Sequence, residues 1–194
     1  MAEISQEPKG LLIYGARCTG KTTLELNLRK AVFNTCKNPL SFTNGRGICF
    51  IGRTVRNQSK VPILQRPILA TAGAELISTF ERVPKAKVYV ASVTPGYDKA
   101  NVLAWFETNL DHVTVICLYG KHRQKYYEKR CKQYSGYCAS NLGPAKLKEP
   151  GFGDMVLPFT MEQLPAAFVA CLHFLGISTE RDFDYDLSSR TDVQ

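Results

Sequence analysis

The sequence has a long internal stretch without acidic residues, which runs between Glu25 and Glu75. The net charge of +8 is therefore concentrated rather than scattered. Scattered lysines usually form a solvated surface, whereas two blocks almost free of acid indicate a polyanion or several phosphate groups as the partner. The first block comprises Arg29, Lys30, Lys37, Arg46, Arg53, Arg56, Lys60 and Arg66. The second, interrupted by Glu128, comprises Lys121, Arg123, Lys125, Lys129, Arg130, Lys132, Lys146 and Lys148.

Long apolar runs and paired cysteine motifs are also missing. No run reaches the roughly 18 residues that a membrane-spanning helix needs, and the polar start from Met1 to Lys9 differs from a secretory signal. The seven cysteines contain no C-x-x-C pair, which favours reduced thiols over a disulfide framework. Nothing near Cys131 and Cys138 completes a metal-binding set of four. We therefore expect no membrane association and a cytoplasmic location, which is the host cytoplasm if the protein is viral.

Short apolar runs alternate with helical patterns along the chain. This alternation predicts a three-layer α/β fold, a five-stranded and mainly parallel sheet with helices on both faces. In such a sheet the binding crevice lies at the carboxyl ends of the strands. We expect a capping box at Thr160-x-x-Gln163. Strands are predicted over 11–14, 48–51, 87–91, 113–118 and 155–157, and helices over 21–36, 74–82, 98–110, 121–134 and 160–175, with loops over 53–71 and 135–153.

A phosphate-binding loop follows the first predicted strand and opens the first predicted helix. Its sequence matches G-x-x-x-x-G-K-[ST] at every fixed position, and it reads Gly15-Ala16-Arg17-Cys18-Thr19-Gly20-Lys21-Thr22, followed by Thr23. Backbone N–H groups of such a loop, together with the helix N-terminus, surround phosphate oxygens. Lys21 is expected to reach the β- and γ-phosphates, and the Thr22 hydroxyl to ligate Mg²⁺. We therefore predict ATP or a similar nucleoside triphosphate as the ligand, with Mg²⁺.

A carboxylate usually accompanies this loop at the end of the third strand. Here that strand ends Val90-Ala91-Ser92-Val93-Thr94, with hydroxyls in place of the acid. Asp98 is the next acid along the chain, and it is either the general base or a residue that caps the following helix. Glu75 is a weaker candidate. If neither carboxylate reaches the γ-phosphate, the protein is a slow enzyme or only binds nucleotide.

The two basic blocks suit an acceptor and a transferring phosphoryl group. Arg53, Arg56 and Lys60 follow the second predicted strand, where acceptor-binding segments occur. The helix over 121–134 would act as a lid, with Arg123 and Arg130 on one face stabilising the charge that develops during transfer. On the same face, Tyr126 and Tyr127 either stack on bases or close the helix onto the sheet, and the sequence does not separate these two roles.

In this order of motifs the chain resembles the small P-loop phosphotransferases, the group of nucleoside monophosphate kinases and polynucleotide kinases. Within the group it is most similar to phage-encoded kinases that phosphorylate 5-hydroxymethyluracil in DNA. The shared features are the phosphate-binding loop, Ile48-Cys49-Phe50-Ile51-Gly52-Arg53, and the stretch from Arg130-x-x-x-Tyr134 to Lys146. The resemblance spans about residues 10–176. The NKxD signature of GTP switches is missing.

These features together predict one kinase-like domain over residues 1–177 and an acidic, disordered tail over 178–194. The predicted activity is ATP-dependent transfer of the γ-phosphoryl group to a hydroxyl of a nucleic acid, including a hydroxymethylated base in DNA, or of a nucleotide. The spread of positive charge favours a nucleic acid over a mononucleotide acceptor. The alternative is a nucleotide-binding regulatory or packaging module that transfers no phosphate.

Overall fold

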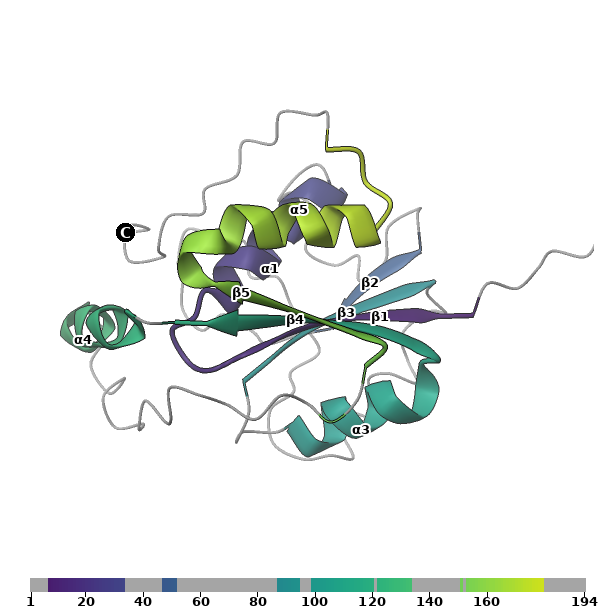
Figure 1. Cartoon of the computed structure of the whole chain (residues 1–194), viewed down its shortest axis with the longest axis horizontal. Coiled ribbons are helices and arrows are strands. Elements are labelled where there is room, and N and C mark those ends of the chain that lie inside the picture. The colour runs from purple at the N-terminus through teal and green to yellow at the C-terminus, as the bar shows by residue number, and fades with distance from the viewer. Residues whose placement is uncertain are drawn as a thin grey trace, which may run out of the picture.

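The computed structural model describes residues 7–33, 47–51, 87–94, 99–120, 122–133, 151 and 153–179. Helices follow most of the strands along these residues (Figure 1). A 3₁₀ turn, η2 (Met161–Gln163), leads into the last helix. The strands are β1 (Lys9–Gly15), β2 (Ile48–Ile51), β3 (Val88–Val93), β4 (His112–Tyr119) and β5 (Met155–Thr160), and the helices are α1 (Lys21–Phe33), α3 (Lys99–Asn109), α4 (Arg123–Gln133) and α5 (Leu164–Phe174).

The strands form one sheet in the order β2-β3-β1-β4-β5, and every neighbouring pair is parallel. The central strand β1 is hydrogen-bonded to β3 on one side and β4 on the other, with Tyr14 level with Val93 and Cys117. Leu11, Leu12 and Ile13 are completely buried, as expected for a strand covered on both faces. The predicted α/β fold with a parallel sheet is confirmed.

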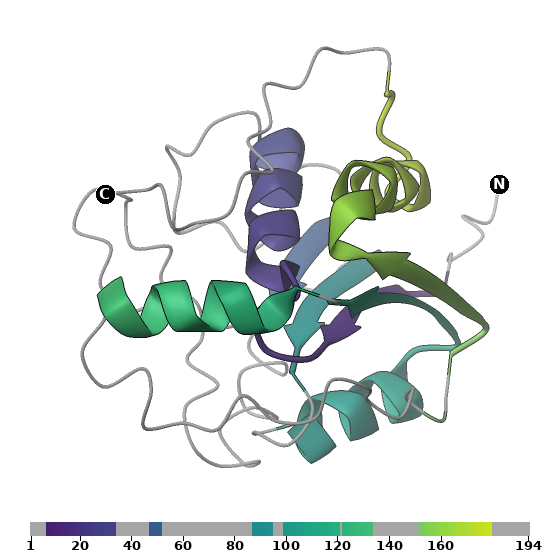
Figure 2. The ribbon, with the colours of Figure 1, turned by 60° about the vertical axis from the view of Figure 1, so that its left-hand side comes forward.

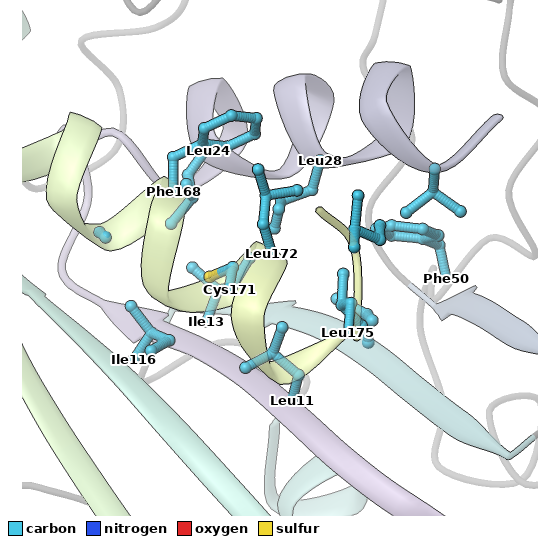
Figure 3. Packing of buried hydrophobic residues seen from close by; sticks show 14 of the residues in the cluster. Leu11, Ile13, Leu24, Leu28, Phe50, Ile116, Phe168, Cys171, Leu172 and Leu175 are labelled. Carbon is cyan, nitrogen blue, oxygen red and sulfur yellow. The ribbon is translucent and has the colours of Figure 1, made fainter. Parts of the chain in front are cut away.

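One face of the sheet is covered by α1 and α5 (Figure 1). Leu24 and Leu28 of α1 pack with Phe168 and Leu172 of α5 over β1, and each is at most 1% exposed (Figure 3). The spacing of four residues places each pair on one side of its helix. Burying an aliphatic or aromatic side chain of this size contributes roughly 1.5 to 3 kcal/mol. This cluster holds the start of α1 against the sheet.

Helix α3 covers the opposite face of the sheet (Figure 1). Phe106 and Leu110 pack closely on β1, where a Cβ added to Gly10 would lie 2.7 Å from Leu110 Cδ1. The ring of Trp105 meets that of Tyr89 edge-on at 5.1 Å. The sheet therefore lies between two helical layers.

Element boundaries differ from the predictions at the last helix and at several strand ends. The helix predicted over 160–175 begins as η2, and α5 follows from Leu164. The Thr160 backbone N–H donates to Gln163 Oε1 at 2.9 Å, as the predicted capping box requires. Strands β3 and β5 extend further than predicted, to Val93 and Thr160. The predicted helix over 74–82 and most of the predicted loops lie outside the described residues.

The cysteines depart in part from the expected reduced state. Cys18, Cys117 and Cys171 are free thiols, and burial raises the pKa of the Cys171 thiol well above its usual range. Cys131, on α4, is disulfide-bonded, contrary to the expectation of reduced thiols throughout. Within the described ranges, no helix is long and apolar enough to span a membrane.

Candidate functional site

The candidate site lies at the carboxyl ends of β1 and β3. The connection that follows β1 leads to α1 on one face of the sheet, and the connection that follows β3 leads to α3 on the other (Figure 1). Neighbouring strands whose connections leave toward opposite faces open a crevice at their carboxyl ends. The loop from Gly15 to Lys21 is at this point, where the sequence predicts a nucleotide.

The loop has the backbone conformation that its sequence demands. Gly20 has φ of +91°, and Cys18, although it is not a glycine, also has a positive φ, at +59°. Gly15 is required for a different reason, because an added Cβ would lie 2.6 Å from the Leu118 carbonyl oxygen on β4. The loop therefore curls tightly between β1 and α1.

Hydrogen bonds within the loop converge on the Ala16 carbonyl. Thr19 Oγ1 donates to it at 2.9 Å, and Lys21 Nζ donates to it from the start of α1. Thr19 is completely buried and Lys21 is 7% exposed. The Lys21 ammonium is consequently folded back over the loop.

The first turns of α1 complete the anion-binding character of the site. The first turn contains no acidic residue, so no side chain of that turn offsets the positive end of the helix dipole. Thr22 is half-buried at this end, and Thr23 is buried. Asn27 Nδ2 donates to the Thr23 carbonyl at 2.9 Å one turn later. Arg17 and Cys18 are half-buried.

The junction between β5 and α5 packs against the phosphate-binding loop and forms one side of the candidate site. A Cβ added to Gly20 would lie 2.8 Å from Leu164 Cδ1, at the start of α5. A Cβ added to Gly120, after β4, would lie 2.9 Å from Met161 Sδ in η2. Sequence reasoning missed this side of the site, because no local pattern links Gly20 to a residue so far along the chain.

The end of β3 lies beside the loop and carries hydroxyl groups. Val90 packs in the cluster under α1 and α5, and side chains alternate along a strand, so Ser92 lies on the same face as α1. Ser92 and Thr94 are half-buried. Asp98 and Glu75, the two predicted carboxylates, lie outside the described residues.

Helix α4 lies beyond the carboxyl ends of the strands, with its first turn next to the start of α1 (Figure 2). Arg123 is 4% exposed there. Burial lowers the pKa of its guanidinium, and the Cys18 side chain acts in the opposite direction, so the two side chains are neighbours. The structure thus brings Arg123 to the predicted phosphate-binding loop. Tyr126 and Tyr127 are half-buried on the same helix.

Other predicted site residues lie outside the described part of the protein, either entirely or in their side chains. The backbone of Arg130 belongs to α4, but its side chain lies outside the described residues. The predicted acceptor residues Arg53, Arg56 and Lys60 lie outside them too. Within the described ranges, no three His, Cys, Asp or Glu side chains cluster as metal ligands.

The arrangement fits a polyphosphate better than it fits a protein-only metal centre. Two buried cations and a helix N-terminus without acid surround the loop, and these features favour an anion. Mg²⁺ accepts a small number of protein oxygens when phosphate oxygens complete its shell. The Thr22 hydroxyl fits that role, so the residues present are compatible with Mg²⁺ bound together with a nucleotide.

Comparisons with known proteins leave the family open. No protein-family model matches the chain, and no curated protein matches it. One solved structure, described as a sugar kinase from Janibacter sp. HTCC2649 in unliganded form, is similar with a TM-score of 0.41 and 13% sequence identity. The match covers 88% of this chain and 96% of that one. A similarity this low assigns neither a family nor a function.

Proposed function

We propose that the protein binds ATP with Mg²⁺ at Gly15–Thr22 and transfers the γ-phosphoryl group to a hydroxyl of a nucleic acid or nucleotide. The observation that carries the proposal is the loop itself. It joins a buried strand to a helix, has positive φ at Cys18 and Gly20, and folds the Lys21 ammonium over its own backbone. This is the context in which the G-x-x-x-x-G-K-[ST] pattern binds phosphates.

Each described residue has a physical role in this proposal. Lys21 would exchange the Ala16 carbonyl for phosphate oxygens, and the N–H groups of the loop would bind the remaining ones. Arg123 would stabilise negative charge on the transferring group, because a buried guanidinium interacts more strongly than a hydrated one. Arg130 is proposed for the same role from its place on α4.

The metal would be held by the Thr22 hydroxyl and phosphate oxygens. Mg²⁺ supplies charge neutralisation between the β- and γ-phosphates when it is bound. Ser92 lies on the face of the sheet next to α1, and its hydroxyl would offer a neutral hydrogen-bonding group in place of the usual carboxylate. Asp98 stays the proposed general base.

The proposed acceptor is a nucleic acid, including DNA with a hydroxymethylated base. This proposal is supported by the concentration of positive charge in the two basic blocks. In the part of these blocks that the structure describes, three lysines on α4 are exposed. A mononucleotide acceptor would require a closed pocket with few cations, and its binding would depend weakly on salt.

Lys21→Ala tests the assignment, with Lys30→Ala as a matched control. Lys30 is exposed in the last turn of the same helix, so both variants remove one cation from α1. We expect Lys21→Ala to lower transfer from γ-labelled ATP by at least about 10²-fold with an unchanged melting temperature. Lys30→Ala should retain the parent rate. The acceptors in the assay are oligonucleotides with and without hydroxymethyluracil. Equal transfer rates for Lys21→Ala and Lys30→Ala would refute the proposal.

The second candidate function is nucleotide binding without transfer. The hydroxyls of Ser92 and Thr94 at the end of β3, where a carboxylate is usual, favour it. Under this alternative, ATP with Mg²⁺ binds to the parent and not to Lys21→Ala, while labelled phosphate never leaves ATP in the presence of any acceptor.

A further inference from the structure

Helix α4 carries a stripe of exposed lysines. Lys125, Lys129 and Lys132 are spaced by four and three residues, which places them on one side of a helix. All three are exposed. At 100° per residue they lie within a sector of about 60°, and along the axis they span about 10 Å. We refer to these three residues as the lysine stripe.

The other side of α4 attaches the helix to the protein. The centre of the lysine stripe is about 200° around the axis from Arg123, which is buried next to Cys18. Tyr127 is about 40° from Arg123 and is half-buried. The stripe therefore faces away from the phosphate-binding loop, and the triphosphate proposed there would not reach it.

The charges around the lysine stripe differ from those around other exposed lysines. Glu128 lies beside the stripe, and Gln124 Nε2 donates to its Oε1 at 2.9 Å. Lys9 and Lys87, by contrast, lie at the amino ends of the strands. The same edge of the sheet carries two exposed carboxylates of opposite charge, Asp154 at the start of β5 and Asp111 just before β4. The stripe thus has an excess of positive charge in a regular row.

We propose that the lysine stripe binds the phosphate backbone of a nucleic acid. A polymer with one phosphate per roughly 3.4 Å of axis in each strand presents three successive charges over the length of the stripe. Lysine ammonium groups on flexible side chains suit contacts of this kind, which carry no sequence information. The inference deepens the proposed function and rests on its nucleic acid acceptor, although the binding itself requires neither ATP nor turnover.

The test measures the affinity of the full chain for a fluorescent 20-base-pair DNA duplex, without nucleotide, between 50 and 200 mM salt. The variant is Lys125→Gln, Lys129→Gln, Lys132→Gln, which keeps helix propensity nearly unchanged. The control is Lys9→Gln, Lys87→Gln, which removes positive charge from exposed sites outside the two basic blocks. If each lysine neutralises one phosphate, the slope of log K against log salt becomes shallower by about 2.7 in the stripe variant only. Over this salt range the parent should then lose about 40-fold more affinity than the stripe variant.

A gain-of-function variant guards against loss by misfolding. Glu128→Gln removes the carboxylate beside the stripe and should tighten duplex binding, while a variant that merely perturbs α4 would weaken it. The proposal is overturned if the stripe variant keeps the parent slope, or if the control variant loses as much affinity as the stripe variant. Loss of phosphate transfer in Lys21→Ala with intact duplex binding would separate this site from the proposed active site.

Discussion

Replacing Gly20 by alanine perturbs the phosphate-binding loop in two independent ways. Gly20 has φ of +91°, and its added Cβ would lie 2.8 Å from Leu164 Cδ1. The first effect is local strain, because side chains rarely adopt such a φ. The second is a tertiary clash with the start of α5, and Leu164 is buried and has little space to move.

The two effects have separate magnitudes. Left-handed backbone costs about 1 to 2 kcal/mol for a residue with a Cβ, and overpacking a buried contact costs about 1 to 3 kcal/mol. We expect Gly20→Ala to lower the free energy of unfolding by about 2 to 5 kcal/mol, the sum of the two effects. For a domain of this size, each 1 kcal/mol corresponds to roughly 2 to 4 °C in melting temperature. The loss should therefore be measurable by urea unfolding followed by circular dichroism.

Two other glycines provide the controls. Gly176 has φ of +66° with nothing within 4 Å of an added Cβ, so Gly176→Ala reports backbone strain alone. Gly151 has neither a positive φ nor a neighbour within 4 Å, and Gly151→Ala should be neutral or slightly stabilising. The reasoning predicts the largest loss for Gly20→Ala. If Gly20→Ala loses no more than Gly176→Ala, the loop does not pack against α5 as described.

Two further substitutions test the same helix and loop. Arg29→Met should lower the free energy of unfolding by about 3 kcal/mol, because it leaves the buried Glu25 carboxylate without the guanidinium that contacts it at 3.1 Å. Adding Glu25→Leu should recover much of that loss, and a single variant as stable as the parent would contradict this interpretation. Cys18→Val should lose about 1 to 2 kcal/mol in urea unfolding, since β-branched residues tolerate φ of +59° poorly. Cys18→Asn should remain near the parent, and equal losses for the two variants would argue against a left-handed Cys18.

Local patterns in the sequence predicted the parts of the fold that local physics determines. The phosphate-binding loop is a continuous motif, so its glycines, Lys21 and the following helix could be placed before any tertiary contact was known. Leu24, Leu28 and Val32 recur every four residues, and such spacing is typical of one buried side of a helix, as the structure shows for α1. Alternating strands and helices predicted the parallel sheet.

Tertiary contacts determine what the sequence did not predict. Polar residues ordinarily lie outside, yet Glu25 and Arg29 are buried beside the apolar stripe of α1, with the Arg29 guanidinium 4.7 Å from the centre of the Phe50 ring. A polar i, i+4 pair on an exposed helix has the same sequence pattern. Arg123 was predicted as a lid residue from its charge, but its burial near Cys18 depends on where α4 begins relative to the loop.

The position of α4 links the two proposed sites. Its first residue, Arg123, is buried at the phosphate-binding loop, while the lysine stripe occupies the opposite side of the same 11-residue helix. A nucleic acid backbone on the stripe and a triphosphate at the loop would therefore be held by one rigid element without competing for the same cations. The stripe contacts phosphates and faces away from the loop, so it would not read the base whose hydroxyl reacts. Selection of the acceptor would then depend on side chains at the crevice between β1 and β3, and α4 would supply affinity for the polymer as a whole.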